Sequence, residues 1–187
     1  MRSELNDIIK QVKLGDHSAF KILVEQYQLF AYKLSFRILY DDEEAKDVVQ
    51  DSFIKIWKNI HSFNNKQKFT TWMYKVVTNT AIDRYRAIKK KSKVDFSIVN
   101  DAINNLTEPN TFIDFENKQL GELIKYLADR LPEKQKLVFV LRDLQGKDSE
   151  EVQEILDISA ITVKSNLYHA RKIIKQKLVA ILDYERR

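Results

Sequence analysis

The chain has 187 residues, of which 44% are hydrophobic and 32% are charged, a mixture that excludes a wholly disordered chain. With only 3 Gly and 2 Pro there are too few turn residues for an all-β sandwich or barrel, and with 0 Cys there are no disulfides or thiolate metal sites. The net charge of +5 is modest, but two acid-free basic runs, 84–93 and 164–177, indicate surfaces that bind polyanions unless they are simply solvated helix faces.

Apolar residues at helical spacing predict four helices before residue 92, packed as one domain of residues 1–92. Residues that favour helix ends separate these helices: Gly15, Asp16, Asp41, Asp42, and Thr70 or Thr71. The polar stretch 61–68 is expected to be a loop. The N-terminus lacks the apolar core of a signal peptide, and no apolar run approaches the roughly 18 residues of a membrane span. We therefore expect a cytoplasmic protein.

Residues 93–113 lose the helical periodicity and collect Asn, Asp, Ser, Thr and Pro109, which predicts a flexible acidic linker with at most a short helical turn at 98–106. Helices resume over 114–130, and Pro132 suits the first turn of the next one, which Gly146 ends. The second predicted domain covers 114–187. The fold class is therefore all-α, with two small helical domains joined by a flexible linker.

The pattern from Asp148 onward is typical of a helix-turn-helix. Asp148 and Glu151 form a capping box, a tight turn follows at 157–159, and a long helix runs from Ala160 to about Leu182. One face of the long helix is apolar, and its early residues are small or polar, as a helix that enters a DNA major groove requires. A helical hairpin within a bundle is the alternative.

The sequence shows no catalytic constellation. The three histidines lie far apart, and there is neither a glycine-rich phosphate loop nor a G-x-S-x-G elbow. We expect no enzymatic activity, cofactor, metal or small-molecule substrate.

Four segments together resemble the extracytoplasmic-function (ECF) sigma factors of the sigma-70 family. GDHSAFKILVEQY is similar to region 2.1, DDEEAKDVVQDSFIKIWKNI to region 2.2, FTTWMYKVVTNTAIDRYR to regions 2.3 and 2.4, and the segment from Leu131 to Leu178 to region 4. The resemblance implies a sigma-2-like helical bundle and a sigma-4-like helix-turn-helix domain. It also implies an alternative sigma factor that binds core RNA polymerase, at the β′ clamp helices and the β flap, and directs promoter-specific initiation. An anti-sigma factor is a further partner typical of the family.

On the region 2.2-like helix, three polar residues lie opposite the apolar stripe, and the resemblance makes them the polymerase contacts: Asp47, Gln50 and Asp51. The region 2.3–2.4 segments and the loop before them resemble the part that captures the −10 element as a single strand with one base flipped out. The candidate −10 contacts are Phe63, Asn64, Asn65, Lys68, Asn79, Asp83, Arg86, Lys89 and Lys90. Trp72 and Phe69 are core residues or stacking platforms.

The region 4-like helix is expected to recognise the −35 element as duplex DNA. Its candidate contacts, which include one residue from the preceding helix, are Arg142, Thr162, Lys164, Ser165, Asn166, Tyr168, His169, Arg171 and Lys172. The chain departs from the family pattern at several positions: Asp157 and Ile161 replace Gly, Asn166 and His169 replace Arg, and Ser149 replaces an aromatic residue. These departures leave the promoter sequence open. A stand-alone helix-turn-helix regulator is the second hypothesis, and a helical enzyme or adaptor for RNA is the third.

Overall fold

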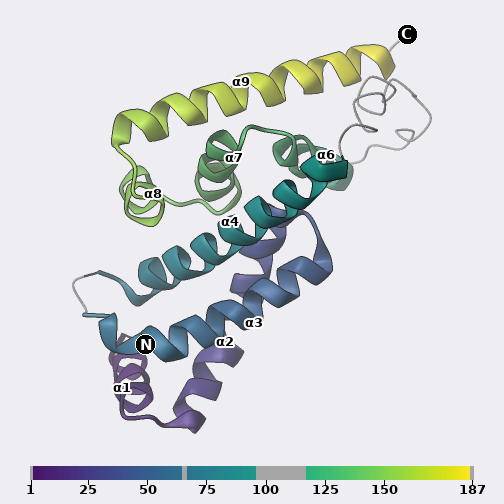
Figure 1. Cartoon of the computed structure of the whole chain (residues 1–187). Coiled ribbons are helices and arrows are strands. Elements are labelled where there is room, and N and C mark those ends of the chain that lie inside the picture. The colour runs from purple at the N-terminus through teal and green to yellow at the C-terminus, as the bar shows by residue number, and fades with distance from the viewer. Residues whose placement is uncertain (1, 65–66, 96–116, 186–187) are drawn as a thin grey trace.

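The computed structural model describes residues 2–64, 67–95 and 117–185, and every regular element in these ranges is helical (Figure 1). The helices in chain order are α1 (Arg2–Lys13), α2 (His17–Leu39), α3 (Asp42–Asn59), η1 (Ile60–Ser62), α4 (Phe69–Asp95), α6 (Asn117–Asp129), α7 (Glu133–Phe139), the π-helical turn η2 (Val140–Leu144), α8 (Ser149–Leu156) and α9 (Ala160–Glu185). The all-α prediction is confirmed.

Several helix ends follow from local capping chemistry. The Asp16 carboxylate accepts hydrogen bonds from the backbone N–H groups of Ser18 and Ala19, and Asp41 accepts one from Glu44. The capping box at the start of α8 is present, with Glu151 N–H donating to Asp148 at 2.7 Å. These predicted starts are therefore confirmed.

The start of α4 differs from the prediction. The helix begins at Phe69, so Thr70 and Thr71 lie in its first turn and do not cap it. The reason is packing: Phe69 is 5% exposed and Thr71 is 4% exposed, because this turn is pressed against the core. Pro132 is the N-cap of α7, one residue before the predicted position. The expected loop 61–68 begins with the short helix η1, while the expected helical turn at 98–106 and most of the linker lie outside the described residues.

Helices α1 to α4 form the N-terminal bundle, in which α2, α3 and α4 pack against one another. Its core contains Leu23, Leu34, Ile38, Ile56 and Val77, each at most 1% exposed. At one end of the bundle aromatic rings connect α2 to α3: His17 stacks on Trp57 with ring centroids 4.6 Å apart. This packing leaves the polar sides of α3 and α4 exposed to solvent.

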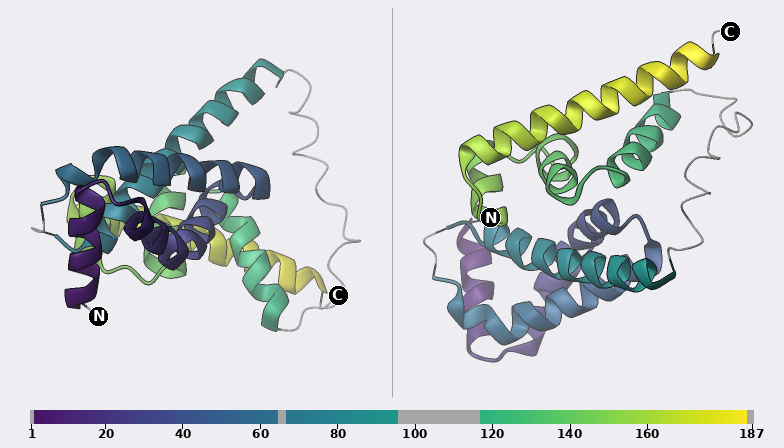
Figure 2. Two further views of the ribbon diagram at one scale, coloured as in Figure 1. Left: turned by 90° about the horizontal axis from the view of Figure 1, so that it is seen from below. Right: turned by 45° about the horizontal axis from the view of Figure 1, so that its top comes forward.

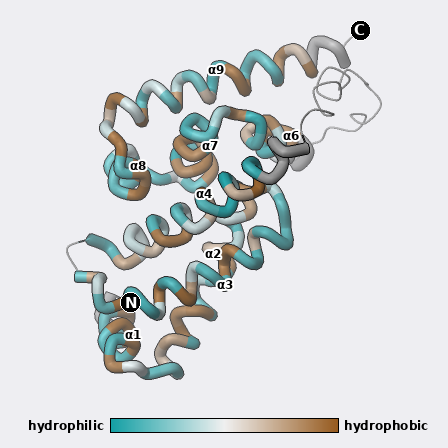
Figure 3. Tube along the Cα trace, viewed as in Figure 1, coloured by the Kyte–Doolittle hydropathy of each residue, from teal (hydrophilic) through white to brown (hydrophobic). Residues whose placement is uncertain are grey.

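Helices α6 to α9 form the C-terminal bundle, in which α9 crosses α7 and also contacts α6 and α8. The predicted inward face of α9 is confirmed, because Val163, Leu167, Ala170 and Ile174 are all buried. Figure 3 shows hydrophobic and hydrophilic residues alternating along α9, as expected for a helix with one buried side. The turn before α9 places Asp157 in the left-handed conformation, with φ of 55°.

The two bundles pack against each other. Helix α4 of the N-terminal bundle contacts α8, and α2 contacts α6 and η2. The right-hand view of Figure 2 shows α9 on the side of the C-terminal bundle away from α3. No helix among the described residues is long and apolar enough to cross a membrane.

Candidate polymerase and nucleic-acid interfaces

The predicted polymerase contacts lie together on the solvent side of α3. Asp47, Gln50 and Asp51 are exposed, with Gln50 and Asp51 one helical turn after Asp47. An apolar residue, Ile54, continues the same line with 51% exposure. Sequence reasoning missed Ile54, although its i+3 spacing from Asp51 places it on this face. We call these four residues the α3 face. It combines two carboxylates, one amide and one apolar side chain.

An arginine of the neighbouring helix is held against this face. The guanidinium of Arg84 on α4 bonds to the Glu44 carboxylate and lies 3.3 Å from Asp47. The hydrogen bond to Glu44, together with the charges of Glu44 and Asp47, raises the pKa of Arg84. Asp51 and Gln50 therefore remain the more accessible polar groups of the α3 face.

The predicted −10 residues on α4 form an exposed line. Asn79, Asp83, Arg86 and Lys90 recur at intervals of four and three residues and are all exposed. Lys89 is also exposed, and its ammonium lies 4.7 Å from the centroid of the Tyr85 ring. The structure therefore brings the α4 members of the predicted −10 set to one side of the helix.

The loop before α4 is arranged differently from the expected open base pocket. Phe63 is only 3% exposed and packs edge to face on Phe69, with ring centroids 5.4 Å apart, and against Trp72 at 5.7 Å. A flipped base could stack on Phe63 only if this aromatic cluster rearranged. Asn64 and Lys68 are exposed, whereas Asn65 lies outside the described residues.

Apart from Thr162, which belongs to the helix cap described below, the predicted −35 residues fall into two groups. The first is exposed along α9: Lys164, Ser165, Tyr168, His169 and Lys172. In the second group, side chains are engaged within the bundle. Arg142 donates to the backbone carbonyl of Lys147, Arg171 binds both carboxylate oxygens of Asp143 at 2.6 and 2.8 Å, and Asn166 donates to the carbonyl of Thr162 at 2.8 Å.

The start of α9 is ordered by a serine cap. The Ser159 hydroxyl lies 2.9 Å from that of Thr162 and accepts the Thr162 backbone N–H at 3.3 Å. This cap satisfies one of the free N–H groups of the first turn. The exposed side chains that follow are therefore presented by a well-defined helix end.

Contacts between the two bundles involve one of the predicted −10 residues. Arg86 of α4 forms a bidentate ion pair with Glu133 of α7, with its Nη2 2.7 Å from Oε1 and its Nε 3.2 and 3.3 Å from the two oxygens. Hydrogen bonding to Glu133 raises the pKa of Arg86. Arg37 of α2 also donates to the Leu144 carbonyl at 2.6 Å. Sequence reasoning did not predict these contacts.

Two lysines of the C-terminal bundle lie over tyrosine rings of α4. Lys136 is 1% exposed, binds Asp129 at 2.6 Å and lies 4.4 Å from the Tyr85 ring centroid; burial lowers its pKa despite the carboxylate. Lys147 lies 4.1 Å from the Tyr74 ring centroid. Burial, with the charge of Glu151 as a smaller cause, raises the pKa of Tyr74 to about 12. The α4 surface that faces the C-terminal bundle is thus partly desolvated.

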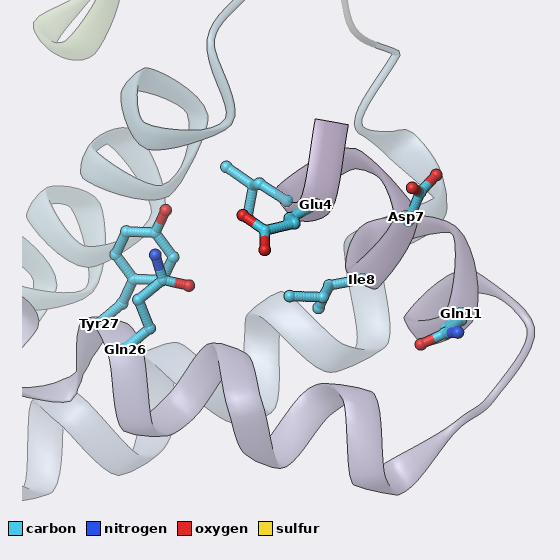
Figure 4. Close-up of a pocket in the computed structure, with 7 residues that line it drawn as sticks. Glu4, Asp7, Ile8, Gln11, Gln26 and Tyr27 are labelled. Atoms are coloured by element: carbon cyan, nitrogen blue, oxygen red, sulfur yellow. The ribbon is translucent and has the colours of Figure 1, made fainter. Parts of the chain in front are cut away.

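Other parts of the described chain offer little chemistry. A hollow between α1 and α2, lined in part by Glu4, Ile8, Gln26 and Tyr27, contains none of the predicted site residues (Figure 4). No group of three or more His, Asp or Glu side chains in the described ranges is placed to hold a metal ion.

Comparisons with known proteins match both bundles. The family model for sigma-70 region 2 matches residues 23–91, and that for sigma-70 region 4 matches residues 121–174. The ECF RNA polymerase sigma factor SigW of Bacillus subtilis is 32% identical over 179 residues, which cover 91% of this chain and 94% of that protein. The chain belongs to the ECF sigma factors of the sigma-70 family. The ECF RNA polymerase sigma-E factor of Haemophilus influenzae is 33% identical over 97% of this chain and 100% of its own length.

Solved structures share the fold of this sigma factor. CnrH, determined in complex with the cytosolic domain of CnrY, superposes with a TM-score of 0.66 at 20% identity, over 92% of this chain and 96% of its own. RpoE of Bartonella quintana, in complex with the anti-sigma factor NepR, gives a TM-score of 0.62 at 19% identity, over 85% of this chain and 96% of its own. Family membership makes the chain an alternative sigma factor for transcription initiation, a non-enzymatic role in which the factor binds core RNA polymerase and promoter DNA.

Proposed function

We propose that this sigma factor binds core RNA polymerase through the α3 face and recognises the two promoter elements with separate bundles. The observation that supports this division most directly is the placement of two exposed faces on different bundles: carboxylates on α3, and Lys164, Ser165 and Lys172 on α9. Carboxylates suit basic groups of a protein partner, whereas lysines suit phosphates. The proposed partner of the α3 face is the pair of β′ clamp helices.

The C-terminal bundle is proposed to recognise the −35 element as duplex. The capped N-terminus of α9 would enter the major groove with Lys164 and Ser165 near base edges and phosphates. Lys172, two turns further along the helix, would contact the backbone. Arg142 bonds to the nearby Lys147 carbonyl and Arg171 pairs with Asp143, so any DNA contact by Arg171 would have to compete with Asp143. The β flap is the proposed polymerase partner of this bundle.

The N-terminal bundle is proposed to capture the −10 element as a single strand along Asn79, Arg86, Lys89 and Lys90. In the described conformation Glu133 binds Arg86 with the geometry that a phosphate would use. Binding of the −10 strand by Arg86 therefore requires this ion pair to break, which separation of the bundles would bring about. The α9 side chains, by contrast, are exposed before any separation.

The proposed domains are 1–92 and 114–187, with 93–113 as an acidic tether. An anti-sigma factor is a proposed regulator, supported by the solved relative RpoE, which was determined with the anti-sigma factor NepR. The proposed site of action is the cytoplasm, where the polymerase transcribes.

Reconstitution tests this proposal. The full-length chain is added to purified core polymerase on a genomic template, and transcript 5′ ends are sequenced. We expect new start sites that share two upstream sequence elements. If core polymerase neither binds the protein nor gains start sites, while the protein alone protects a palindrome in a footprint, the stand-alone regulator hypothesis replaces it.

A further inference from the structure

The first turn of α9 carries an apolar side chain that nothing in the described structure covers. Ile161, the second residue of the helix, is 82% exposed. A single exposed apolar residue is common on protein surfaces and needs no explanation by itself. The position of Ile161 gives it significance, because it lies on the helix end that is proposed to enter the major groove.

Ile161 belongs to the outermost line of α9. Ser165, Tyr168 and Lys172 follow it at intervals of four, three and four residues, and all are exposed. The buried residues Val163, Leu167, Ala170 and Ile174 lie on the opposite side of the helix. A groove that receives α9 along this line would meet Ile161 among its first contacts. In Figure 1 this helix runs along the edge of the molecule, with α7 and α8 on its inner side.

The chemistry of the side chain limits what it can recognise. Isoleucine forms no hydrogen bonds, so it cannot distinguish the donors and acceptors of base edges. The apolar group that base pairs present in the major groove is the C5 methyl of thymine. A β-branched side chain also has one strongly preferred χ1 rotamer in a helix, so little conformational freedom is lost when it packs on a methyl group. Polar contacts to the same site come from its exposed neighbours Lys164 and Ser165.

We propose that Ile161 is a specificity-determining residue of this sigma factor that packs against a thymine methyl group in the −35 duplex. The proposal rests on the proposed recognition of the −35 element by α9 and adds a base preference to it. The same contact with cytosine would lack the methyl group, so thymine is preferred over cytosine at that position.

The test compares thymine with deoxyuridine, which lacks only the methyl group. Holoenzyme reconstituted from the full-length chain first selects its preferred −35 sequence from a randomised duplex library. Each thymine of the selected site is then replaced singly by deoxyuridine, and binding is measured. We expect a loss of about 4-fold at one position, as for removal of one buried methyl group. With Ile161→Ala, the ratio of the affinity for the thymine site to that for the deoxyuridine site should fall to about 1 at that position. At the other positions this ratio should stay unchanged.

Val179→Ala is the matched control, because Val179 is a half-exposed apolar residue of the same helix, five turns further along. It should retain the thymine preference. The inference is overturned if the selected site contains no methyl-sensitive thymine, or if Ile161→Ala keeps the same sensitivity. Failure to select any duplex sequence would instead contradict the proposed −35 function.

Discussion

The ion pair between Arg86 and Glu133 offers a direct way to shift the balance between packed and separated bundles. Glu133→Gln keeps the shape of the side chain and removes its charge. The side chain of Arg86 is 62% exposed and that of Glu133 is 30% exposed. An ion pair this solvated contributes about 0.2–1 kcal/mol, and its bidentate geometry favours the upper end. At about 1 kcal/mol, the ratio of packed to separated molecules should fall about fivefold.

The absence of cysteine from the sequence makes the distance between the bundles easy to measure. Spin labels on Lys58→Cys and Gln176→Cys, both at exposed positions, report the distance between α3 and α9 by pulsed electron paramagnetic resonance. Glu133→Gln should increase the population of long distances. Glu154→Gln, which removes the same charge from an exposed residue of α8, should leave the distances unchanged.

The same variant should bind single-stranded DNA better. If separation limits access to Arg86, the free protein's affinity for a single-stranded −10 oligonucleotide should rise by up to about fivefold with Glu133→Gln. The reasoning is refuted if Glu133→Gln and Glu154→Gln give the same distance distribution, since the ion pair would then not hold the bundles together.

Three further predictions concern the α3 face, the turn before α9 and the interface tyrosine. Replacing both Asp47 and Asp51 by Ala should weaken binding to core polymerase about tenfold or more while circular dichroism stays unchanged; undiminished binding would exclude the α3 face as the contact. Asp157→Gly should stabilise the protein by about 1 kcal/mol in urea unfolding, because φ of 55° strains a residue with a Cβ, and a decrease would show that Asp157 has a stabilising contact. Because burial raises the pKa of Tyr74 to about 12 from 10, its stabilising contribution is complete below pH 10 and lost as the pH rises towards 12. Burial also raises the pKa of Tyr27, and the hydrogen bond to Asp42 raises that of Tyr32, so absorbance at 295 nm should show several late-ionising tyrosines. Tyr74→Phe should remove one of them, and an unchanged late-ionising absorbance would contradict the assignment.

Local chemistry made much of the fold predictable from the sequence. The Asp148–Glu151 capping box and the buried face of α9 follow from residue type and helical spacing, which need no knowledge of distant partners. The start of α4 was not predictable in the same way. Thr70 and Thr71 are good capping residues, but burial of the neighbouring Phe69 placed them inside the helix.

The candidate site was predictable only as a set of exposed residues. Asp47, Gln50 and Asp51 lie on one exposed face of α3, as helical spacing predicted. The partner of Arg86 was not predictable in this way, because a guanidinium that suits a phosphate binds a carboxylate equally well. Spacing therefore could not show that Arg86 meets Glu133, 47 residues away. The role of Phe63 was equally hard to predict, because an aromatic residue after a helix can belong to the core or line a base pocket. In the structure Phe63 packs on Phe69 and belongs to the core.

In the proposed function both bundles act together at one promoter, held at a fixed separation by the polymerase. Once a start site is mapped with reconstituted holoenzyme, insertion of about five base pairs between its two elements turns the −35 duplex by half a helical turn. Initiation from that site should fall at least tenfold, while binding of the protein to the isolated −35 duplex should not change. Undiminished initiation from the lengthened promoter would contradict joint recognition by the two bundles.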